Sequence, residues 1–406
     1  MAAATVIERR ETFAAPREDL PVAALLVLAM TGFTAILTET LPAGLLPQMA
    51  EGLGISQSLA GQTVTVYAVG SLIAAIPLTL WTQGWRRKPA LLLAIAGFLV
   101  FNTITALSTS YAITLAARFL AGMAAGLGWG IVSGYARRMV VERLQGKALA
   151  IAMAGTPLAL ALGVPAGALF GATVGWRPAF LLMSTTTLFL LVWVIWKMPD
   201  FPGQSAERRL SLIGVMRTPG VRTVLAVLFL WVTGHNILYT YVTPFAALSG
   251  LGNSIDLLLL AFGLAALASI WLTGVLVDRL LRTLVLGSLF AFCATALALA
   301  LFTTVSPVMI AAMIVWGLSF GGAATQLQTA LADAAGEGVD LANAMLTTVW
   351  NSAIAAGGLV GGILLDQSGA GPLAWTALLL ATAALIIATI TRTHAFVVGP
   401  RAHHRS

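Results

Sequence analysis

The sequence predicts an all-α integral membrane protein whose twelve transmembrane helices form two pseudo-symmetric six-helix bundles. Its 406 residues are 59% hydrophobic and only 9% charged, whereas about 25% of the residues of an ordinary soluble protein are charged. Twelve long apolar runs divide the chain, and a helix needs about 20 mainly apolar residues to cross a bilayer. Basic residues fall almost entirely in every second gap between the runs, as expected when alternate gaps lie on one side of a membrane.

The predicted spans leave no gap that is long enough for a large soluble domain. The lipid bilayer is therefore the expected surroundings of most of the chain. The spans cover residues 22–47, 59–80, 90–107, 111–135, 148–171, 179–196, 223–246, 255–277, 283–301, 307–331, 342–365 and 372–391.

The distribution of Lys and Arg predicts the orientation. All but two of the 22 basic residues lie in the tails or in the even-numbered gaps, and the positive-inside rule assigns that side, and so both termini, to the cytoplasm. The exceptions are Arg177, in an odd-numbered gap, and Arg118, inside a span. The gap between spans 10 and 11 departs locally, because it holds acidic but no basic residues. The net charge of +7 is explained by loops beside anionic lipid, so no nucleic-acid partner is expected.

A polar, proline-containing stretch between spans 6 and 7 divides the spans six and six. The spans on its two sides echo each other: Ile36-Leu37 and Pro42 in span 1 match Ile237-Leu238 and Pro244 in span 7. Internal duplication is typical of secondary transporters, whose sites lie between the repeats near the midplane. We expect a cytoplasmic tail (1–21), an N-terminal bundle (22–196), a cytoplasmic linker (197–222), a C-terminal bundle (223–391) and a second cytoplasmic tail (392–406).

Small residues recur every four positions in span 5, where the set is Gly155, Ala159, Gly163, Gly167 and Gly171. Positions i and i+4 lie on one face of a helix, and a ridge of small residues lets two helices approach closely in lipid. The ridge is interpreted either as a tight packing surface or as a smooth face along which helices slide. Pro157 and Pro165 each remove a helical hydrogen bond, so we expect kinks there.

Two opposite charges are predicted at the same depth in the membrane. Glu39 in span 1 and Arg118 in span 4 each lie about 7 Å from the midplane on the outer side, at 1.5 Å per residue. Charges inside a membrane usually face the bundle interior and mark functional sites. Two interpretations remain: a static salt bridge, or a titratable carboxylate whose proton affinity depends on its distance from the guanidinium.

Further polar residues predicted inside spans are candidates for lining a substrate cavity, although each is equally explained by a hydrogen bond to a neighbouring helix. They are His235, Asn236, Tyr239, Gln326 and Asn351. His235 stands out because imidazole titrates near neutral pH. No phosphate-binding loop, metalloprotease motif or catalytic triad is found, and Cys293 is the single cysteine. We therefore expect neither an enzyme nor a bound cofactor or metal.

Four motifs give the chain a resemblance to the major facilitator superfamily. They are Thr38-Glu39 followed by GLLP at 44–47; the R-x-x-x-G motif of Arg118 and Gly122; LGVPAG at 162–167 followed by Gly175-Trp176-Arg177; and Gly274, Asp278, Arg279 and Arg282 after span 8. The likeness covers nearly the whole chain. It is closest to the twelve-span drug:proton antiporter branch, which includes arabinose/sugar, chloramphenicol and purine-nucleoside exporters.

The resemblance implies roles for these motifs. It implies proton coupling for Arg118 and a gating loop around Asp278. It also implies an antiporter motif in span 5 that consists of Gly155, Pro157, Gly163, Pro165, Gly167 and Gly171. The gating motif is usually stronger after span 2, but residues 82–88 read TQGWRRK. This loop has no acidic residue, so an Asp-dependent latch is not expected in the first half.

The predicted function is proton-coupled efflux of small organic molecules, such as drugs, sugars or nucleosides, by a monomer in a bacterial-type cytoplasmic membrane. Glu39 is the predicted proton or substrate carboxylate, and Arg118 is its charge partner. A proton symporter or facilitator that imports a small metabolite is the first alternative, because direction is poorly encoded in sequence. A non-transporting membrane sensor is the second, but it offers no reason for paired charges inside the membrane.

Overall fold

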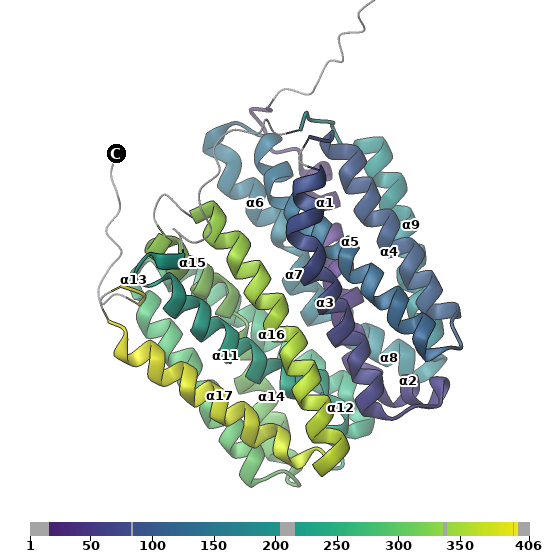
Figure 1. Ribbon diagram of the computed structural model, residues 1–406, viewed down its shortest axis with the longest axis vertical. Coiled ribbons are helices and arrows are strands. Elements are labelled where there is room, and N and C mark those ends of the chain that lie inside the picture. Colours follow the sequence, from purple (N-terminus) through teal and green to yellow (C-terminus); the bar gives the residue numbers. More distant parts are fainter. Residues whose placement is uncertain (1–15, 83, 204–215, 336–338, 393, 397–406) are drawn as a thin grey trace, which may run out of the picture.

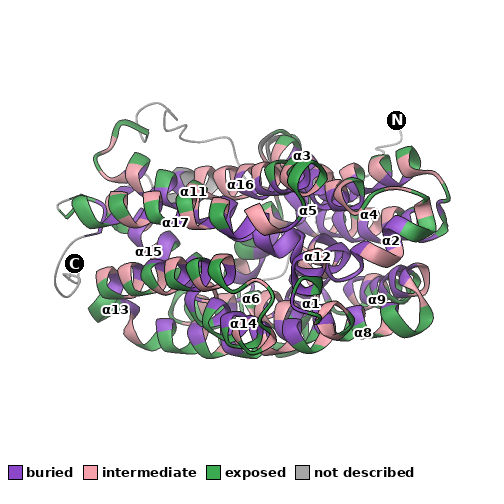
Figure 2. Cartoon of the chain, turned by 90° about the horizontal axis from the view of Figure 1, so that it is seen from below, coloured by how far each residue is buried: buried purple, intermediate pink, exposed green. Residues whose placement is uncertain are grey.

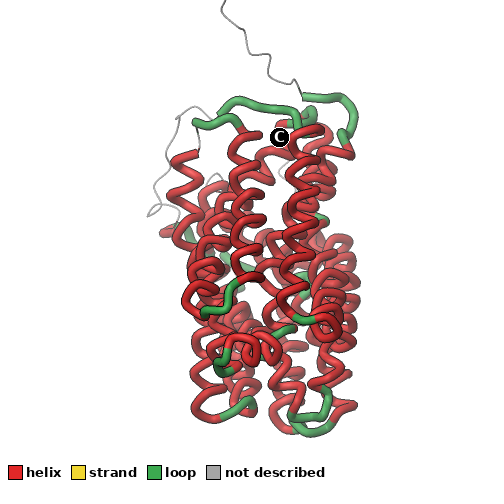
Figure 3. Tube along the Cα trace, turned by 90° about the vertical axis from the view of Figure 1, so that its right-hand side faces the viewer, coloured by secondary structure: helices red, strands yellow, loops and turns green. Residues whose placement is uncertain are grey.

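The computed structural model describes residues 16–82, 84–203, 216–335, 339–392 and 394–396. Within these ranges the chain is built from helices and contains no β-strand beyond an isolated bridge between Arg17 and Val140. The helices run roughly side by side, and the loops gather at the two ends of the molecule (Figures 1 and 3). The predicted all-α fold is confirmed. Most of both predicted tails, and residues 204–215 of the predicted linker, lie outside the described residues.

The N-terminal half supplies the first six spans. Span 5 is the most irregular of them, because it is divided among α6, α7, a π-helical turn and α8. The elements are α1 (Val22–Gly44), α2 (Leu46–Leu53), α3 (Gln57–Thr82), α4 (Arg87–Leu107), α5 (Tyr111–Arg138), α6 (Gln145–Met153), α7 (Gly155–Leu158), the π-helix η2 (Ala159–Gly163), α8 (Val164–Val174) and α9 (Trp176–Lys197).

The C-terminal half repeats this pattern. Its elements are α11 (Val221–Thr240), α12 (Val242–Ala247), α13 (Ile255–Leu301), α14 (Ser306–Phe320), α15 (Ala323–Ala335), α16 (Val339–Ser368) and α17 (Gly371–Ile390). The described residues contain 11 helices that are long and apolar enough to cross a membrane. One of them, which includes α13, accounts for two predicted spans, because the backbone leaves helical geometry at Leu280 (φ −130°, ψ 27°).

The kink in span 5 has an identifiable cause. Pro157 stands in α7 and Pro165 at the start of α8, and the π-helical turn lies between them. A proline has no N–H to donate and crowds the preceding turn, and π-helical turns are common where a helix absorbs such a defect. The predicted distortion at both prolines is therefore present as one wide turn.

The outer surface of the bundle is apolar, as lipid requires. Large hydrophobic side chains are exposed on its rim, among them Phe189 (70%), Trp196 (78%) and Trp271 (71%). Buried faces gather instead near the middle of the molecule, around α1 and α12, which contact each other (Figure 2). Because lipid tails are as apolar as leucine, helices in a membrane associate through close packing and polar contacts rather than through the hydrophobic effect.

Glycines pack the same pairs of helices together in both halves. A Cβ added at Gly122 of α5 would overlap the backbone carbonyl of Tyr67 in α3. A Cβ added at Gly317 of α14 would overlap the carbonyl of Phe262 in α13. Both residues of the second pair stand 195 positions after those of the first, and Gly126 and Gly321 repeat the relation one turn later. The two bundles therefore share one internal packing scheme.

The two halves are joined at one end of the molecule, which carries α2 and α12 and is called the α2–α12 end. Within the described ranges, every hydrogen bond between the halves lies toward this end; the pairs are Ser58–Gly362, Gln62–Tyr241, Gln62–Gly358, Tyr241–Ser58 and Thr243–Ala43. Toward the opposite end, which carries α6 and α15, the ribbons of the halves diverge (Figure 1).

Candidate functional site

Arg118 is the most deeply buried charge in the N-terminal half. It belongs to α5, has no exposed surface, and lies against α3 because Gly122 allows the two backbones to approach. Its Nε donates to the carbonyl of Thr63 (3.3 Å), and its Nη2 donates to the backbone carbonyl of Glu39 (3.4 Å). The guanidinium also lies over the ring of Tyr67, 4.8 Å from its centroid. Neutral groups and an aromatic face thus surround the charge.

Glu39 lies beside Arg118, but its carboxylate does not pair with the guanidinium. Among the described residues the carboxylate forms neither an ion pair within 4.0 Å nor a hydrogen bond, and the two groups interact through space. Glu39 retains 7% of its surface, whereas Arg118 retains none. The two residues are therefore close, and the ion pair that the static salt-bridge interpretation requires is not formed in this structure.

The glycine ridge of span 5 holds the helix that carries Glu39. A Cβ at Gly155 would overlap the carbonyl of Ala29, and a Cβ at Gly163 would lie 2.8 Å from the ring of Phe33. Gly167 and Gly171 face Leu41 and Leu45 of the same region in the same way. These glycines therefore pack span 5 against α1 within one half. The contact between halves uses the neighbouring face, where Ala161 lies against Gly263 of α13.

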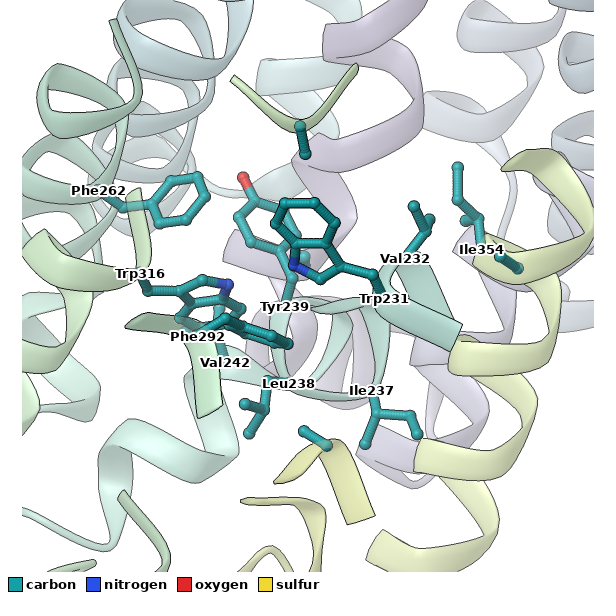
Figure 4. Close-up of a cluster of buried hydrophobic side chains, with 14 of the residues drawn as sticks. Trp231, Val232, Ile237, Leu238, Tyr239, Val242, Phe262, Phe292, Trp316 and Ile354 are labelled. Carbon is teal, nitrogen blue, oxygen red and sulfur yellow. The ribbon is translucent and has the colours of Figure 1, made fainter. Parts of the chain in front are cut away.

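An aromatic cluster occupies the corresponding part of the C-terminal half. His235 of α11 accepts a hydrogen bond at Nδ1 from Nε1 of Trp316 (2.9 Å). Its ring stacks on Phe320, with centroids 3.5 Å apart and planes 2° apart. Tyr239, Phe262 and Trp316 also contact the His235 ring, and Figure 4 shows these three side chains gathered in one cluster with Trp231. His235 is thus held by its neighbours on both faces of the ring and at one nitrogen.

The other polar candidates are held mainly by helix backbone or by neighbouring helices. Asn236 and Asn351 each donate to the carbonyl four residues earlier in their own helix (2.9 Å). Gln326 of α15 donates to Thr273 Oγ1 and to Ser288 Oγ, both 3.2 Å away in α13. The buried hydroxyl of Tyr239, which is the only polar group of that side chain, has no hydrogen-bond partner among the described residues, and neither has Oε1 of Gln326.

The loop motif after span 8 lies at the kink of α13. Asp278 and Arg279 are exposed next to Leu280, and a Cβ added at Gly274 would meet no atom within 4 Å. Arg282 donates to the carbonyls of Ala388, Thr391 and Phe396 and, through Nη2, of Thr389. Arg282 therefore satisfies carbonyls at the end of α17, where a helix leaves its last acceptors without partners.

An acidic residue from elsewhere in the chain completes the loop after span 2. Asp200, which follows α9, accepts from Arg86 Nε at 2.6 Å and from the backbone N–H of Lys88 at 3.1 Å. Sequence inspection finds no acid within residues 82–88 and therefore predicts no charge pairing there. The structure corrects this expectation, since the partner is distant in sequence and close in space. Tyr135, whose hydroxyl donates to the Pro199 carbonyl at 2.5 Å, fixes the same segment.

Two residues near Glu39 were not singled out from the sequence. Tyr67 donates to the carbonyl of Ala35 (3.0 Å), and Asn102 donates to Thr38 Oγ1 (2.9 Å), one residue before Glu39. Asn102 has no exposed surface, and its Oδ1 has no partner among the described residues. The sequence feature that could have identified Asn102 is a polar side chain within an apolar span. No group of three or more potential metal ligands occurs in the described parts of the chain.

Comparison with known proteins places this architecture in a family. The sequence model of the Major Facilitator Superfamily matches residues 28–339 and 253–405. The chain belongs to this superfamily and is a multi-pass membrane transporter of small molecules rather than an enzyme.

Two curated proteins with similar sequences are bacterial efflux pumps. The chain is 29% identical to the purine ribonucleoside efflux pump NepI of Escherichia coli O127:H6, over 87% of this chain and 90% of that protein. It is 28% identical to the NepI protein of Escherichia coli K12 over the same shares. The crystal structure of the human organic anion transporter MFSD10 (TETRAN) matches with a TM-score of 0.68 at 17% identity, covering 91% of this chain and 100% of the other. That likeness confirms the fold.

Proposed function

We propose that the protein is a proton-coupled exporter that moves small organic molecules out of the cell by alternating access. The positive-inside pattern assigns the α6–α15 end to the cytoplasm, and it assigns the joined α2–α12 end to the outside. The arrangement described above then corresponds to an inward-facing state. In the other state the halves would rock so that the outer end opens, which is the usual motion around a site between repeats.

The observation that carries this proposal is the unpaired carboxylate of Glu39 beside the buried Arg118. A buried charge without a close counter-ion is costly, so Glu39 and Arg118 gain free energy when the ionised carboxylate approaches the guanidinium. Proton binding to Glu39 removes that attraction. Movement of α1 relative to α5 would therefore change the proton affinity of Glu39, and proton binding would change the preferred position of α1.

The burial of Arg118 suits it to the role of a fixed charge. Its guanidinium lies against the rings of Tyr67 and Phe180 and has no exposed surface, and Glu39 beside it is buried as well. The positive charge would therefore stay in place while the charge of the carboxylate changes with its proton.

Purine nucleosides are the proposed substrate class. The curated relatives named above are purine ribonucleoside efflux pumps, and the match covers 87% of this chain. The ring cluster around His235 includes Tyr239, whose buried hydroxyl has no hydrogen-bond partner among the described residues. Such groups offer stacking faces and a polar contact to a planar heterocycle, and we place the substrate between this cluster and Glu39.

Gating is proposed at the cytoplasmic ends of the spans. Asp278 and Arg279 would latch the inner end when it closes, and Arg282 keeps the end of α17 in place beside them. In the N-terminal half the Arg86–Asp200 pair fixes the matching loop to the segment after α9. We assign both termini to the cytoplasm and propose that the monomer is the transporting unit.

The test is proton release from inverted membrane vesicles on addition of inosine. The wild type should release protons into the medium when the nucleoside is exchanged, and Glu39→Gln should abolish this release while leaving the folded protein in the membrane. Glu51→Gln is the matched control, because Glu51 is an exposed glutamate at the outer end of the same region.

Unchanged proton release in Glu39→Gln would remove Glu39 from the mechanism. Inosine transport by the wild type without any proton movement would instead support uncoupled transport. Inosine accumulation in right-side-out cells under an inward proton gradient would favour the importer alternative.

A further inference from the structure

Tyr241 occupies the break between α11 and α12 and connects both halves. It is the residue at which the helix ends (φ −112°, ψ 29°), and it has no exposed surface. Its hydroxyl donates to the carbonyl of Gly358 in α16 (2.7 Å) and accepts from Nε2 of Gln62 in α3 (3.1 Å). One side chain therefore joins the broken helix of span 7 to a second helix of its own half and to one of the other half.

Glycines shape the space around this ring. A Cβ added at Gly61 of α3 would overlap the ring of Tyr241, and a Cβ at Gly361 of α16 would lie 2.8 Å from it. A Cβ at Gly362 would lie 2.6 Å from the hydroxyl and would overlap Nε2 of Gln62. Three glycines from two helices thus leave room for one tyrosine. A larger residue at Gly61 or Gly362 would push the halves apart, and one at Gly361 would push α16 away from Tyr241.

The Gln62–Tyr241 contact differs in kind from the other bonds between the halves. Within the described ranges it is the one hydrogen bond between two side chains that crosses from half to half; the others end on a backbone carbonyl. A bond made by two side chains can be removed from either side without changing the backbone. Gln62 Nε2 also lies 3.2 Å from the Gly358 carbonyl, so the three groups form a compact triangle.

We propose that Tyr241 and Gln62 form a lock that holds the outer end closed and sets how much of the protein faces inward. This inference rests on the proposed alternating-access function and adds the residues that control its equilibrium. Opening the outer end must separate α3 from α12 and α16, and this separation breaks the hydrogen bonds that Gln62 Nε2 donates to the Tyr241 hydroxyl and to the Gly358 carbonyl. The bond from the Tyr241 hydroxyl to Gly358 lies within the C-terminal half and stays intact. A Gln62 amide that loses its acceptors in a water-poor site is unfavourable, so the closed state is stabilised while the lock is intact.

The lock is a positioning device, and it does not touch the proposed substrate. Tyr241 lies two residues beyond Tyr239, on a different face of the chain and past the helix break. Its removal should therefore change the balance of the two states and leave the chemistry at Glu39 in place.

The experiment measures the populations of the inward-facing and outward-facing states from distances between pairs of spin labels in detergent-purified protein. The labels are attached to introduced cysteines, and Cys293→Ser removes the single native cysteine. One spin-label pair, at Glu51 and Leu248, reports the outer end, and a second pair, at Lys147 and Thr283, reports the inner end; all four side chains are exposed. Tyr241→Phe should raise the ratio of outward-facing to inward-facing protein about threefold, because one interhelical hydrogen bond in a membrane protein is weak. Lengthened outer distances should appear together with shortened inner distances.

Tyr111→Phe is the matched control. The hydroxyl of Tyr111 also donates to a backbone carbonyl, that of Leu59 at 2.8 Å, but donor and acceptor belong to one half. This variant loses a comparable hydrogen bond and should leave the ratio of states unchanged. Gln62→Leu is the second test variant, since it keeps Tyr241 and should shift the ratio in the same direction even where Tyr241→Phe is poorly folded.

Distances in Tyr241→Phe and Gln62→Leu that match those of Tyr111→Phe would overturn the lock. Proton-coupled inosine exchange that persists in such variants would then leave the proposed function standing. Wild-type distances that stay at one value at both ends, with and without inosine and across pH, would instead contradict alternating access itself.

Discussion

The two halves of this transporter use the same backbone packing for different chemistry. Gly122 and Gly126 join α5 to α3, and Gly317 and Gly321 join α14 to α13 at positions 195 residues later. Arg118 stands one turn before the first pair, and the residue at the matching place in the second half is the fully buried Met313. The difference shows that the close helix contacts are the same in both halves, whereas the side chains next to those contacts differ.

The consequence is a division of roles between the halves. The N-terminal half places a fixed positive charge and an unpaired carboxylate at one level of the membrane. The C-terminal half fills the corresponding region with stacked rings around His235. If this comparison is correct, proton coupling should depend on the first half, and mutations in the aromatic cluster should alter stability or substrate preference without uncoupling transport.

The largest expected effect is that of Arg118→Ala on coupling. Coupling between two sites is typically worth about 5- to 150-fold in affinity, so proton-driven inosine export in proteoliposomes should fall by at least about tenfold. Arg118→Lys should be impaired as well, because an ammonium cannot reach both the Thr63 and the Glu39 carbonyl in the same geometry. Met313→Leu is the control at the matching position and should export normally. Loss of membrane expression alone, with normal export per molecule, would indicate a purely structural role for Arg118.

Packing mutations should sharpen the comparison because they should act equally in both halves. Gly122→Leu and Gly317→Leu each place bulk against a backbone carbonyl, and overpacking costs about 1–3 kcal/mol. Thermal unfolding in detergent should show similar losses for the two variants. Gly134→Leu is the control, because a Cβ there meets nothing within 4 Å. A marked loss of thermal stability in only one of the two variants would show that the shared packing contributes unequally to the stability of the two halves.

A smaller effect is expected from His235→Phe. Phenylalanine keeps the stacking on Phe320 but leaves the Nε1–H of Trp316 without its acceptor, and a buried unsatisfied donor costs about 1–3 kcal/mol. The unfolding temperature should fall, and the number of protons exchanged per inosine should stay the same. A changed proton-to-substrate ratio, measured in proteoliposomes, would place His235 in the coupling path and break the division between the halves.

The smallest effect is expected from Asp200→Asn. The amide oxygen can still accept from the backbone N–H groups of Lys88 and Phe201, so the variant mainly loses its charge attraction to the half-exposed Arg86. Such surface pairs contribute about 0–1 kcal/mol. Export should fall slightly, and Arg86→Gln should have a similar effect that does not add to it. Full additivity in the double variant would show that the two residues act separately.

The large features of the fold can be predicted from the sequence, whereas the contacts between residues distant in sequence cannot. Span 5 was expected to bend at Pro157 and Pro165, and the structure adds that one π-helical turn absorbs both. The glycine ridge was recognised from its spacing, but spacing could not tell that its partner is α1 rather than the other half. Asp200 was out of reach for a different reason, because its partner Arg86 is separated from it by four spans.

The sequence by itself determined the helical membrane fold, the number of spans, the duplication and the presence of two opposite charges at one depth. These features follow from local composition and periodicity, because lipid imposes span length and forces backbone groups to bond within their own helix. Only the tertiary structure decided that Arg118 bonds to the Glu39 carbonyl instead of its carboxylate, that Tyr241 bridges the halves and that they meet at the α2–α12 end. Those contacts depend on how helices distant in sequence rotate and cross, and no local pattern encodes that geometry.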